Sequence, residues 1–477
     1  MIYSYNTHQK VISNLIKLCL GLILALLLTG CAGEPTTTTQ ATLTPQSTLT
    51  GQTDTTPTPG QTHAVDPVHS VSPVITFPNQ TPDLQKTTTP DYNPLLPGQV
   101  RPSNPKAELY NPGPGKALPK NTLVVGTDSG LYLLNPTGGP EKLLVGGASF
   151  MDPSISPDGQ NITAFRRDPL TRQSQLVLVN LGGSLKPVTF DTGGIVMAAA
   201  WSPDSKKLAL TRATDTNNDG LVDVFDQTSL VLYEVASGKQ TALAEGGYGA
   251  WSADGLRLAY IIPGATDSNL DPTTRQLRRG PNALGVYNFS TKAKRTLLES
   301  KGQLLGLANA SFTPIPPDIN LDLRYFKSVA WHPDNRHFTA SADAVGPSGL
   351  RAGIILTITL DDPTPRILTA AGDAASRVTW SPDGKQLAFE TIPQFPVTAK
   401  SANQVALLKV VSLENSAPVR TMLGAAATRS ETRRPVWSPD SQQLAYLSGD
   451  TSILTLADAT GQNPRYLLAG CQGFDWF

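Results

Sequence analysis

The sequence predicts an all-β protein built as a single β-propeller of seven four-stranded blades. Three observations support this fold class. A turn motif recurs along the chain, a short apolar strand precedes each copy, and alternating apolar runs follow it. A unit repeated at a regular interval is typical of architectures whose neighbouring repeats bury one another. The six copies read Ile155-Ser156-Pro157-Asp158-Gly159, Trp201-Ser202-Pro203-Asp204-Ser205, Trp251-Ser252-Ala253-Asp254-Gly255, Trp331-His332-Pro333-Asp334-Asn335, Trp380-Ser381-Pro382-Asp383-Gly384 and Trp437-Ser438-Pro439-Asp440-Ser441.

Each repeat supplies four strands in the order A, B, C and D. Strand A ends at the Trp or its substitute, the turn follows, and short runs such as 208–210 and 258–260 form strand B. Runs such as 176–179 and 230–233 form strand C, and a short strand D precedes the next repeat. Period-two alternation broken by Gly, Pro, Asn and Asp indicates strands. Pro presets φ at the turn and Asp accepts backbone hydrogen bonds, so we assign the repeated Asp residues to turn chemistry rather than catalysis.

A seventh blade is predicted from strands at both ends of the repeat region. The six motifs each open a full unit, whereas Asp475-Trp476-Phe477 supplies a strand A only. The runs 123–126, 131–134 and 142–145 are predicted to be strands B, C and D, and no copy of the turn motif precedes them. A closed ring removes the exposed edges of its first and last sheets, and a blade shared by both ends achieves this closure. If one repeat is degenerate, the propeller has six or eight blades instead.

The repeated motif resembles the WD-repeat-like "Pro-Asp" family, best known from the TolB-like propellers of the Tol–Pal system. The resemblance covers roughly residues 120–477 and implies a propeller fold. Similar blades accompany prolyl-oligopeptidase-type hydrolases and occur in some lyases, so the fold alone does not assign a function. The chain differs from TolB because a low-complexity tract, rather than an α/β domain, precedes its blades. The number of predicted blades is also seven rather than six.

The first thirty residues read as a signal peptide. Lys10 and Lys17 precede an apolar core at 18–28, which is too short to span a bilayer comfortably and ends in Leu28-Thr29-Gly30-Cys31. An ordinary signal peptide or a short membrane helix are the alternatives. The block looks like a bacterial lipobox. This resemblance implies that Cys31 carries acyl chains, palmitate among them, and becomes the mature N-terminus. Multiple acyl chains anchor stably. We therefore expect a lipoprotein on the outer face of the cell membrane, or on the periplasmic face of a two-membrane envelope.

Residues 31–118 are predicted to be the lipidated Cys and a disordered linker, and 119–477 the propeller. The tract is rich in Thr, Pro, Gln and Ser with few large apolar residues, so it cannot bury enough surface to offset its ordering entropy. The chain carries 38 basic and 38 acidic residues, which argues against a nucleic-acid partner. With Cys19 removed and Cys31 lipidated, Cys471 has no disulfide partner and is expected to be a buried apolar residue.

One long connection between strands B and C of the second blade has the spacing of a calcium loop. Oxygen-bearing side chains stand at positions 1, 3, 5, 9 and 12 of 215–226, with Gly220 at position 6. Calcium binds six to eight hard oxygens, so we predict a structural calcium ion here; an Asx-rich hairpin without metal is the alternative. The predicted ligands are Asp215, Asn217, Asp219, the Leu221 carbonyl, Asp223 and Asp226.

Long insertions indicate which side of the propeller recognises a partner. The A–B and C–D turns are short, whereas B–C and D–A connections are long in several repeats and emerge on one face. Variable loops on a rigid scaffold commonly carry recognition, although neutral insertion is the alternative. The predicted partner-contacting residues are Arg275, Arg278, Arg279, Phe312, Tyr325, Phe326 and Phe395.

Signals for catalysis are few. Of five histidines only His332 and His337 lie in the repeats, too few for the His-rich metal centre of some propeller lyases, and no Gly-x-Ser-x-Gly elbow occurs. We therefore expect a non-enzymatic binding or scaffold propeller, anchored to a membrane, that presents a loop-rich face to a protein, peptide or glycan of the cell envelope. The alternatives are a propeller enzyme, lyase or hydrolase, acting on extracellular polymers and an accessory subunit of an envelope complex.

Overall fold

A computed structural model of the chain describes most of the repeat region, and every regular element in the described residues is a strand. No helix within these residues is long and apolar enough to cross a bilayer. The signal peptide, Cys31 and most of the expected linker lie outside the described residues. The structure describes residues 102–113, 115–190, 193–216, 222, 226–270, 277–279, 281–300, 303–304, 321–345, 351–368, 373–393, 407–412, 420–421, 432–449 and 452–477.

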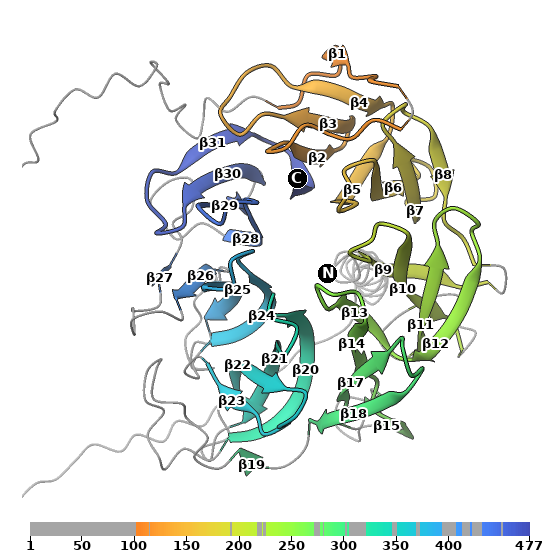
Figure 1. The fold of residues 1–477 in the computed structure, drawn as a ribbon, viewed down its shortest axis with the longest axis vertical. Coiled ribbons are helices and arrows are strands. Elements are labelled where there is room, and N and C mark those ends of the chain that lie inside the picture. Colours follow the sequence, from red (N-terminus) through yellow and green to blue (C-terminus); the bar gives the residue numbers. More distant parts are fainter. Residues whose placement is uncertain are drawn as a thin grey trace, which may run out of the picture. The chain divides into compact units, whose positions relative to one another are not determined.

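Seven sheets of four or five strands stand around a common centre, as Figure 1 shows, so the predicted seven-bladed propeller is confirmed. The first three whole blades follow the predicted A-B-C-D order. Blade I contains β5 (Ser149–Ile155), β6 (Asn161–Arg167), β7 (Ser174–Asn180) and β8 (Leu185–Pro187). Blade II contains β9 (Ile195–Trp201), β10 (Lys207–Thr214), β11 (Gln227–Glu234) and β12 (Gln240–Glu245). Blade III contains β13 (Gly247–Trp251), β14 (Arg257–Ile262), β17 (Ala283–Asn288) and β18 (Lys294–Glu299), and its B–C connection carries the hairpin β15 (Thr266–Leu270) and β16 (Leu277–Arg279).

The next three blades repeat this order. Blade IV contains β20 (Leu321–Trp331), β21 (His337–Val345), β22 (Arg351–Thr359) and β23 (Arg366–Ile367), with β19 (Gln303–Leu304) added beside β20. Blade V contains β24 (Asp373–Trp380), β25 (Gln386–Pro393), β26 (Leu407–Ser412) and β27 (Arg420–Thr421). Blade VI contains β28 (Thr432–Trp437), β29 (Gln443–Ser448), β30 (Ile453–Asp458) and β31 (Arg465–Leu468).

Blade VII is shared by the two ends of the repeat region, as predicted. Its innermost strand is β32 (Cys471–Trp476), which pairs antiparallel with β2 (Leu123–Thr127) so that Leu123 faces Trp476. Strands β3 (Gly130–Leu134) and β4 (Lys142–Gly146) continue the sheet outward. Cys471 is buried in this blade with only 1% of its surface exposed, as expected for an apolar role, and burial raises its pKa to about 12.

The chain joins the propeller earlier than the predicted boundary at residue 118. Strand β1 (Glu108–Leu109) pairs parallel with the outer edge of β4, and Pro102 forms a bridge with Ala469. The Asn104 amide donates to the carboxylate of Glu141, and the Leu118 amide donates to the carbonyl of Gly159 in blade I. We call residues 102–118 the entry strap. The sequence suggested linker here because the strap is polar and Pro-rich and contributes few buried side chains.

In five of the six blades whose innermost strand ends in Trp, the indole bonds to the preceding blade. The indole Nε1–H of Trp201 donates to the Ser154 carbonyl at 3.1 Å, and the same contact recurs from Trp251, Trp331 and Trp437 to carbonyls of β9, β13 and β24. A hydrogen bond of this kind contributes about 0.5–1.5 kcal/mol to stability. The repeated spacing of Trp and turn therefore sets the contact between neighbouring blades.

The repeated Ser-Pro-Asp turn is closed by its own side chains, as predicted from the turn chemistry. The Ser202 hydroxyl donates to Asp204 Oδ1 at 2.5 Å and accepts the Lys207 amide at 2.9 Å. The fifth residue of the motif can also link two turns, since Ser205 Oγ accepts the Asp158 amide of the previous blade. The repeated Asp residues therefore act in structure, and these bonds hold the pKa of Asp204 below its usual value although burial acts in the opposite direction.

The innermost strands are bent by β-bulges that the sequence reading did not anticipate. Register shifts occur in all seven innermost strands, and several bulged residues adopt positive φ, among them Asp152 at 47°, Tyr248 at 56° and Arg434 at 58°. A bulge turns a side chain away from its regular direction. Pro153 and Pro435, which follow two of these residues, are a usable signal because Pro inside a sheet is found at edges and bulges.

Candidate functional site

The two faces of the propeller carry connections of different length. We call the face formed by the B–C and D–A connections the loop face, and the face formed by the A–B and C–D turns the turn face. The longest B–C connections are 215–226, 263–282 and 394–406, and the longest D–A connection is 300–320, whereas A–B turns such as 202–206 are short. The strand boundaries therefore confirm that the elaboration lies on one face.

A cavity of about 430 Å³ opens on the loop face between blades I and II. The B–C connection of blade I and the segment leading from β8 into β9 form its walls. Leu176, Val188 and Phe190 are buried and line it together with polar side chains that are mostly exposed. The lining residues are Arg166, Asp168, Thr171, Gln173, Ser174, Gln175, Leu176, Val188, Thr189, Phe190, Gly194, Ile195 and Val196.

The polar wall of this cavity is held in place by local bonds. Asp168 accepts the amides of Leu170 and Thr171 at 2.8 and 2.7 Å, and these bonds lower its pKa, so the carboxylate is charged at neutral pH. The guanidinium of Arg212 lies 5.5 Å from the centre of the Phe190 ring, a cation–π contact that steadies the wall. The hollow therefore combines buried apolar groups with exposed polar ones.

Exposed apolar side chains gather around this cavity and along the loop face. Leu170 is 91% exposed on the B–C connection of blade I, and Ile195, Tyr248 and Tyr325 lie toward the loop-face ends of β9, β13 and β20. We call these four residues the apolar arc. Partial burial raises the pKa of Tyr248, with a smaller contribution from Tyr325 on the adjacent blade. Among the described residues, the two other exposed large apolar side chains are Leu109 on β1 and Leu256 on the turn face.

The predicted partner-contacting residues have different outcomes. Tyr325 is 39% exposed and belongs to the apolar arc. The prediction for Phe326 is wrong, because its side chain is completely buried in the core of blade IV and its backbone bonds to the Asn282 side chain. Period-two alternation explains the difference, since neighbouring residues on a strand point to opposite sides. Arg278 and Arg279 lie on β16, while Arg275, Phe312 and Phe395 lie outside the described residues.

The predicted calcium loop is described only in part, at residues 215, 216, 222 and 226. Asp215 follows β10, and Asp226 is completely buried before β11. Asp226 Oδ1 accepts the Thr216 amide at 2.9 Å and the Thr216 hydroxyl at 3.2 Å, which closes the neck of the loop. Asn217, Asp219, Leu221 and Asp223 lie outside the described residues, so the calcium ion stays a prediction.

Ionisable residues on the innermost strands β20, β24 and β28 pair with acids. Lys327 Nζ lies 2.6 Å from Asp343 Oδ1, and Arg377 Nε lies 3.8 Å from Glu390 Oε2. Arg434 extends across β32, donates to the Gln472 carbonyl at 3.0 Å and pairs with Asp152 of blade I. Its backbone amide donates to the Glu390 carboxylate of blade V. Arg434 therefore connects blades V, VI, VII and I.

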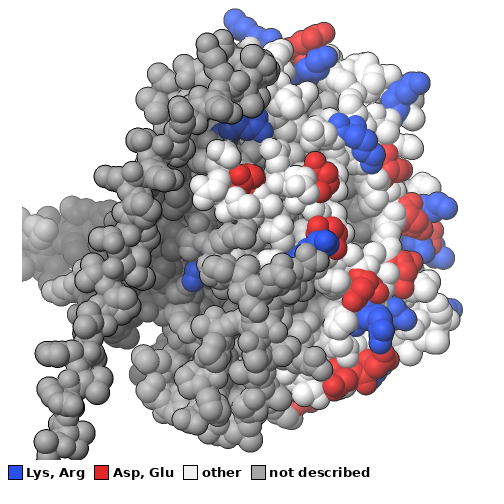
Figure 2. All heavy atoms as spheres, turned by 60° about the vertical axis from the view of Figure 1, so that its left-hand side comes forward, with Lys and Arg blue, Asp and Glu red and all other residues white. Residues whose placement is uncertain are grey.

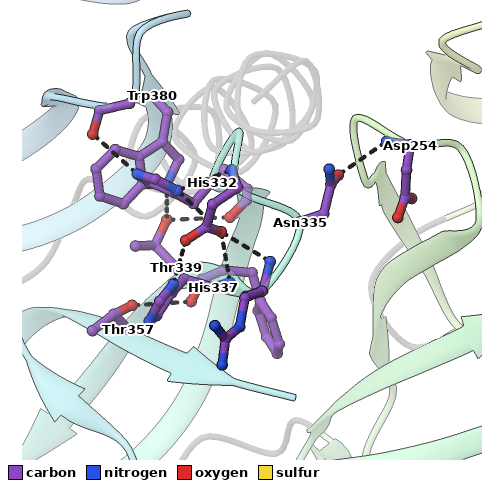
Figure 3. A network of polar contacts seen from close by, with 12 residues as sticks. Asp254, His332, Asn335, His337, Thr339, Thr357 and Trp380 are labelled. Carbon is purple, nitrogen blue, oxygen red and sulfur yellow. Dashed lines mark hydrogen bonds and ion pairs between the residues drawn. The ribbon is translucent and has the colours of Figure 1, made fainter. Parts of the chain in front are cut away.

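A second polar group lies on the turn face of blade IV, where His332 replaces the usual Ser of the motif (Figure 3). His332 Nδ1 lies 3.1 Å from Asp334 Oδ1, and His337 Nδ1 lies 2.5 Å from Asp334 Oδ2. Burial acts to raise the pKa of Asp334, but bonds from the His337 and Arg336 amides and from the His337 ring hold it well below its usual range. The two histidines were noted in the sequence, but the converging Asp334 was read only as a turn residue.

Charges on the described surface are mixed. Where Figure 2 colours the surface, Lys and Arg side chains alternate with Asp and Glu, and neither sign forms a continuous patch. This distribution agrees with the balanced composition of 38 basic and 38 acidic residues. A large single-sign field that would attract a polyanion or polycation is not seen on this part of the surface.

Comparison with known proteins gives distant structural likenesses only. No protein-family model matches the chain, and no curated protein matches it significantly. TolB from Acinetobacter baumannii is similar with a TM-score of 0.41 and 16% identity, over 74% of this chain and 81% of that one. A prolyl endopeptidase structure gives a TM-score of 0.49 and 14% identity, over 77% of this chain and 51% of that one. The Pyrococcus horikoshii acylaminoacyl peptidase gives 0.46 and 15%, over 69% and 48%.

Proposed function

We propose that the protein is a binding or scaffold propeller that recognises a protein, peptide or glycan of the cell envelope through its loop face. The observation that carries this proposal is the apolar arc beside the loop-face cavity, because solvent-exposed aromatic and aliphatic groups on a rigid scaffold are typical of recognition surfaces. The longest connections border the same surface, and such loops commonly carry recognition.

The paired charges on the innermost strands favour binding over catalysis. General acid–base chemistry needs a titratable group that reaches the substrate with a proton to give or take. Lys327, Arg377 and Arg434 instead contact acids of the propeller itself. These contacts support the ring, so the arrangement offers no specific reason to prefer an enzyme acting on extracellular polymers.

Site-specific photo-crosslinking in intact cells tests the proposal. A photoreactive residue at Leu170, on the loop face, is compared with one at Leu256, which is also exposed and apolar but lies in an A–B turn on the turn face. We expect a discrete product from position 170 that disappears when Ile195 is replaced by Asp. Equal products from positions 170 and 256, or a product at 170 that Ile195→Asp does not reduce, would contradict recognition through the loop face.

We also propose that acylated Cys31 anchors the protein to a membrane on the extracytoplasmic side. The proposal rests on the lipobox-like sequence ending at Cys31 and on the Thr- and Pro-rich tract after it. Metabolic labelling with an alkyne palmitate analogue should mark the wild-type chain, and Cys31→Ala should remove both the label and the membrane fraction. Membrane association that persists in the unlabelled variant would refute the lipid anchor.

A further inference from the structure

We propose that the turn formed by His332, Asp334 and His337 binds a divalent transition-metal ion of the zinc class. The three residues come from one A–B turn and the first position of β21. Their nearest ligand atoms all lie within 4.8 Å of one another. Two imidazoles and one carboxylate are a ligand set that suits Zn²⁺, Cu²⁺ or Ni²⁺, whereas calcium and magnesium prefer oxygen alone.

The ring of His332 is already orientated as a metal ligand would be. Its Nε2 lies 3.0 Å from the Gly384 carbonyl, and its Nδ1 accepts the Asp334 amide at 3.1 Å. These contacts place the proton on Nε2, so the acceptor lone pair lies on Nδ1, the nitrogen that faces Asp334. In this structure that lone pair accepts the Asp334 amide, and binding an ion exchanges this hydrogen bond for a bond to the metal. A ligating histidine commonly donates its other N–H to a carbonyl in this way. The indole of Trp380 packs against the ring edge-on with centroids 4.6 Å apart, which restricts its rotation (Figure 3).

The distances within the group need only a small adjustment. An ion with bonds of about 2.1 Å holds neighbouring ligand atoms about 3.0–3.4 Å apart. The 3.1 Å between His332 Nδ1 and Asp334 Oδ1 already fits this range, while the 2.5 Å between His337 Nδ1 and Asp334 Oδ2 must lengthen. The side chain of His337 is 44% exposed, so its ring has room to move. On binding, the ion takes the place of the proton between His337 Nδ1 and Asp334, and the neutral His337 ring carries its proton on Nε2 instead.

The other copies of the motif show that this group is not needed to close the turn. In five copies a Ser hydroxyl bonds the Asp and accepts the amide five residues on, as Ser381 does with Asp383 and Gln386. In blade IV the corresponding amide of His337 donates to Asp334 instead. Replacing His332 by Ser therefore restores the common turn, which makes His332→Ser a variant expected to fold.

Zinc titration of the full chain tests the site. Isothermal titration calorimetry in a non-chelating buffer should show one Zn²⁺ per chain, and His332→Ser or His337→Gln should each weaken binding at least tenfold. The control variant replaces His8, His63 and His69 by Gln, which removes the other histidines of the chain and should leave the affinity unchanged. No zinc uptake by the wild type, or equal affinity in all variants, would overturn the proposal.

X-ray absorption of the zinc-loaded full chain supplies a second readout that does not depend on stability. The proposal predicts two imidazoles in the first shell and the loss of one in His332→Ser at saturating zinc. A first shell of oxygen alone, or one unchanged in the variant, would overturn it. Zinc should also raise the melting temperature of the wild type but not of His337→Gln, since only a protein that binds the ion in its folded state is stabilised by it.

Discussion

Replacing Arg434 by Gln should weaken the closed ring more than an equivalent change elsewhere on the innermost strands. The variant keeps an unbranched stem, so the positive φ of 58° at this position is no less tolerated than in the wild type. The change removes the charged bond to the Gln472 carbonyl and the ion pair with Asp152. Burial lowers the pKa of Arg434 to about 10, so the guanidinium remains charged at neutral pH and both interactions are present.

The expected loss of unfolding free energy is about 2.5–4 kcal/mol. A hydrogen bond from a charged group contributes about 1.5–3 kcal/mol. The pair with Asp152 is partly screened because the two side chains are 24% and 38% exposed, so we expect it to add about 1 kcal/mol. Asp152→Asn keeps a residue that tolerates positive φ and should cost about 1 kcal/mol. In the double variant the two losses should be less than additive by about 1 kcal/mol.

Urea unfolding at pH 7, followed by circular dichroism and by Trp fluorescence, measures these values. The matched control is Arg377→Gln, which changes the same residue type at positive φ in blade V. Arg377 is 49% exposed and lies 3.8 Å from Glu390, so its replacement should cost less than about 0.5 kcal/mol. Equal losses from Arg434→Gln and Arg377→Gln, or a coupling below about 0.3 kcal/mol between positions 434 and 152, would refute the reasoning.

Three further predictions concern the closing blade, the blade junctions and the calcium loop. Burial raises the pKa of Asp475 to about 6, so the folded chain binds this proton more tightly than the unfolded chain. The stability of the wild type relative to Asp475→Asn, measured in urea, should therefore fall by about 2–3 kcal/mol between pH 4 and pH 7 and then level off. Trp201→Phe removes the 3.1 Å indole bond to the Ser154 carbonyl, which keeps the Thr163 hydroxyl as a donor, and should lower the unfolding free energy by about 0.5–1.5 kcal/mol; a loss below about 0.3 kcal/mol would contradict the assigned role. Chelation should lower the melting temperature of the wild type but not of Asp219→Ala, and an unchanged melt with and without chelator would exclude structural calcium.

The fold could be predicted because local and repeated signals agree. Trp, Pro and Asp recur at one spacing, and Trp476 at the far end of the repeats matches strands 123–127 at the near end, so blade closure followed from counting. The reach of Arg434 could not be read in the same way. Its ion-pair partner Asp152 lies in another blade, far away in the sequence, and an isolated Arg before a Pro carries no sign of that partner.

The candidate sites were predictable only in part for similar physical reasons. Loop length indicated the face, but a difference of one position separates exposed Tyr325 from buried Phe326. The strand pairing needed to choose between them was not available in the sequence, because the bulges of β20 interrupt its alternation. His332 and His337 were visible, yet the turn geometry was needed to bring Asp334 between them.

The entry strap has a mechanical consequence for a chain that is pulled from its N-terminal side. Tension applied ahead of Pro102 reaches the bridge to Ala469 and the exposed two-residue pairing of β1 with β4 before it reaches any blade strand. These few bonds should separate at low force, whereas β2 remains paired between β3 and β32 and keeps the ring closed. Under load, residues 102–118 would then detach from the propeller and extend, while the blades stay folded.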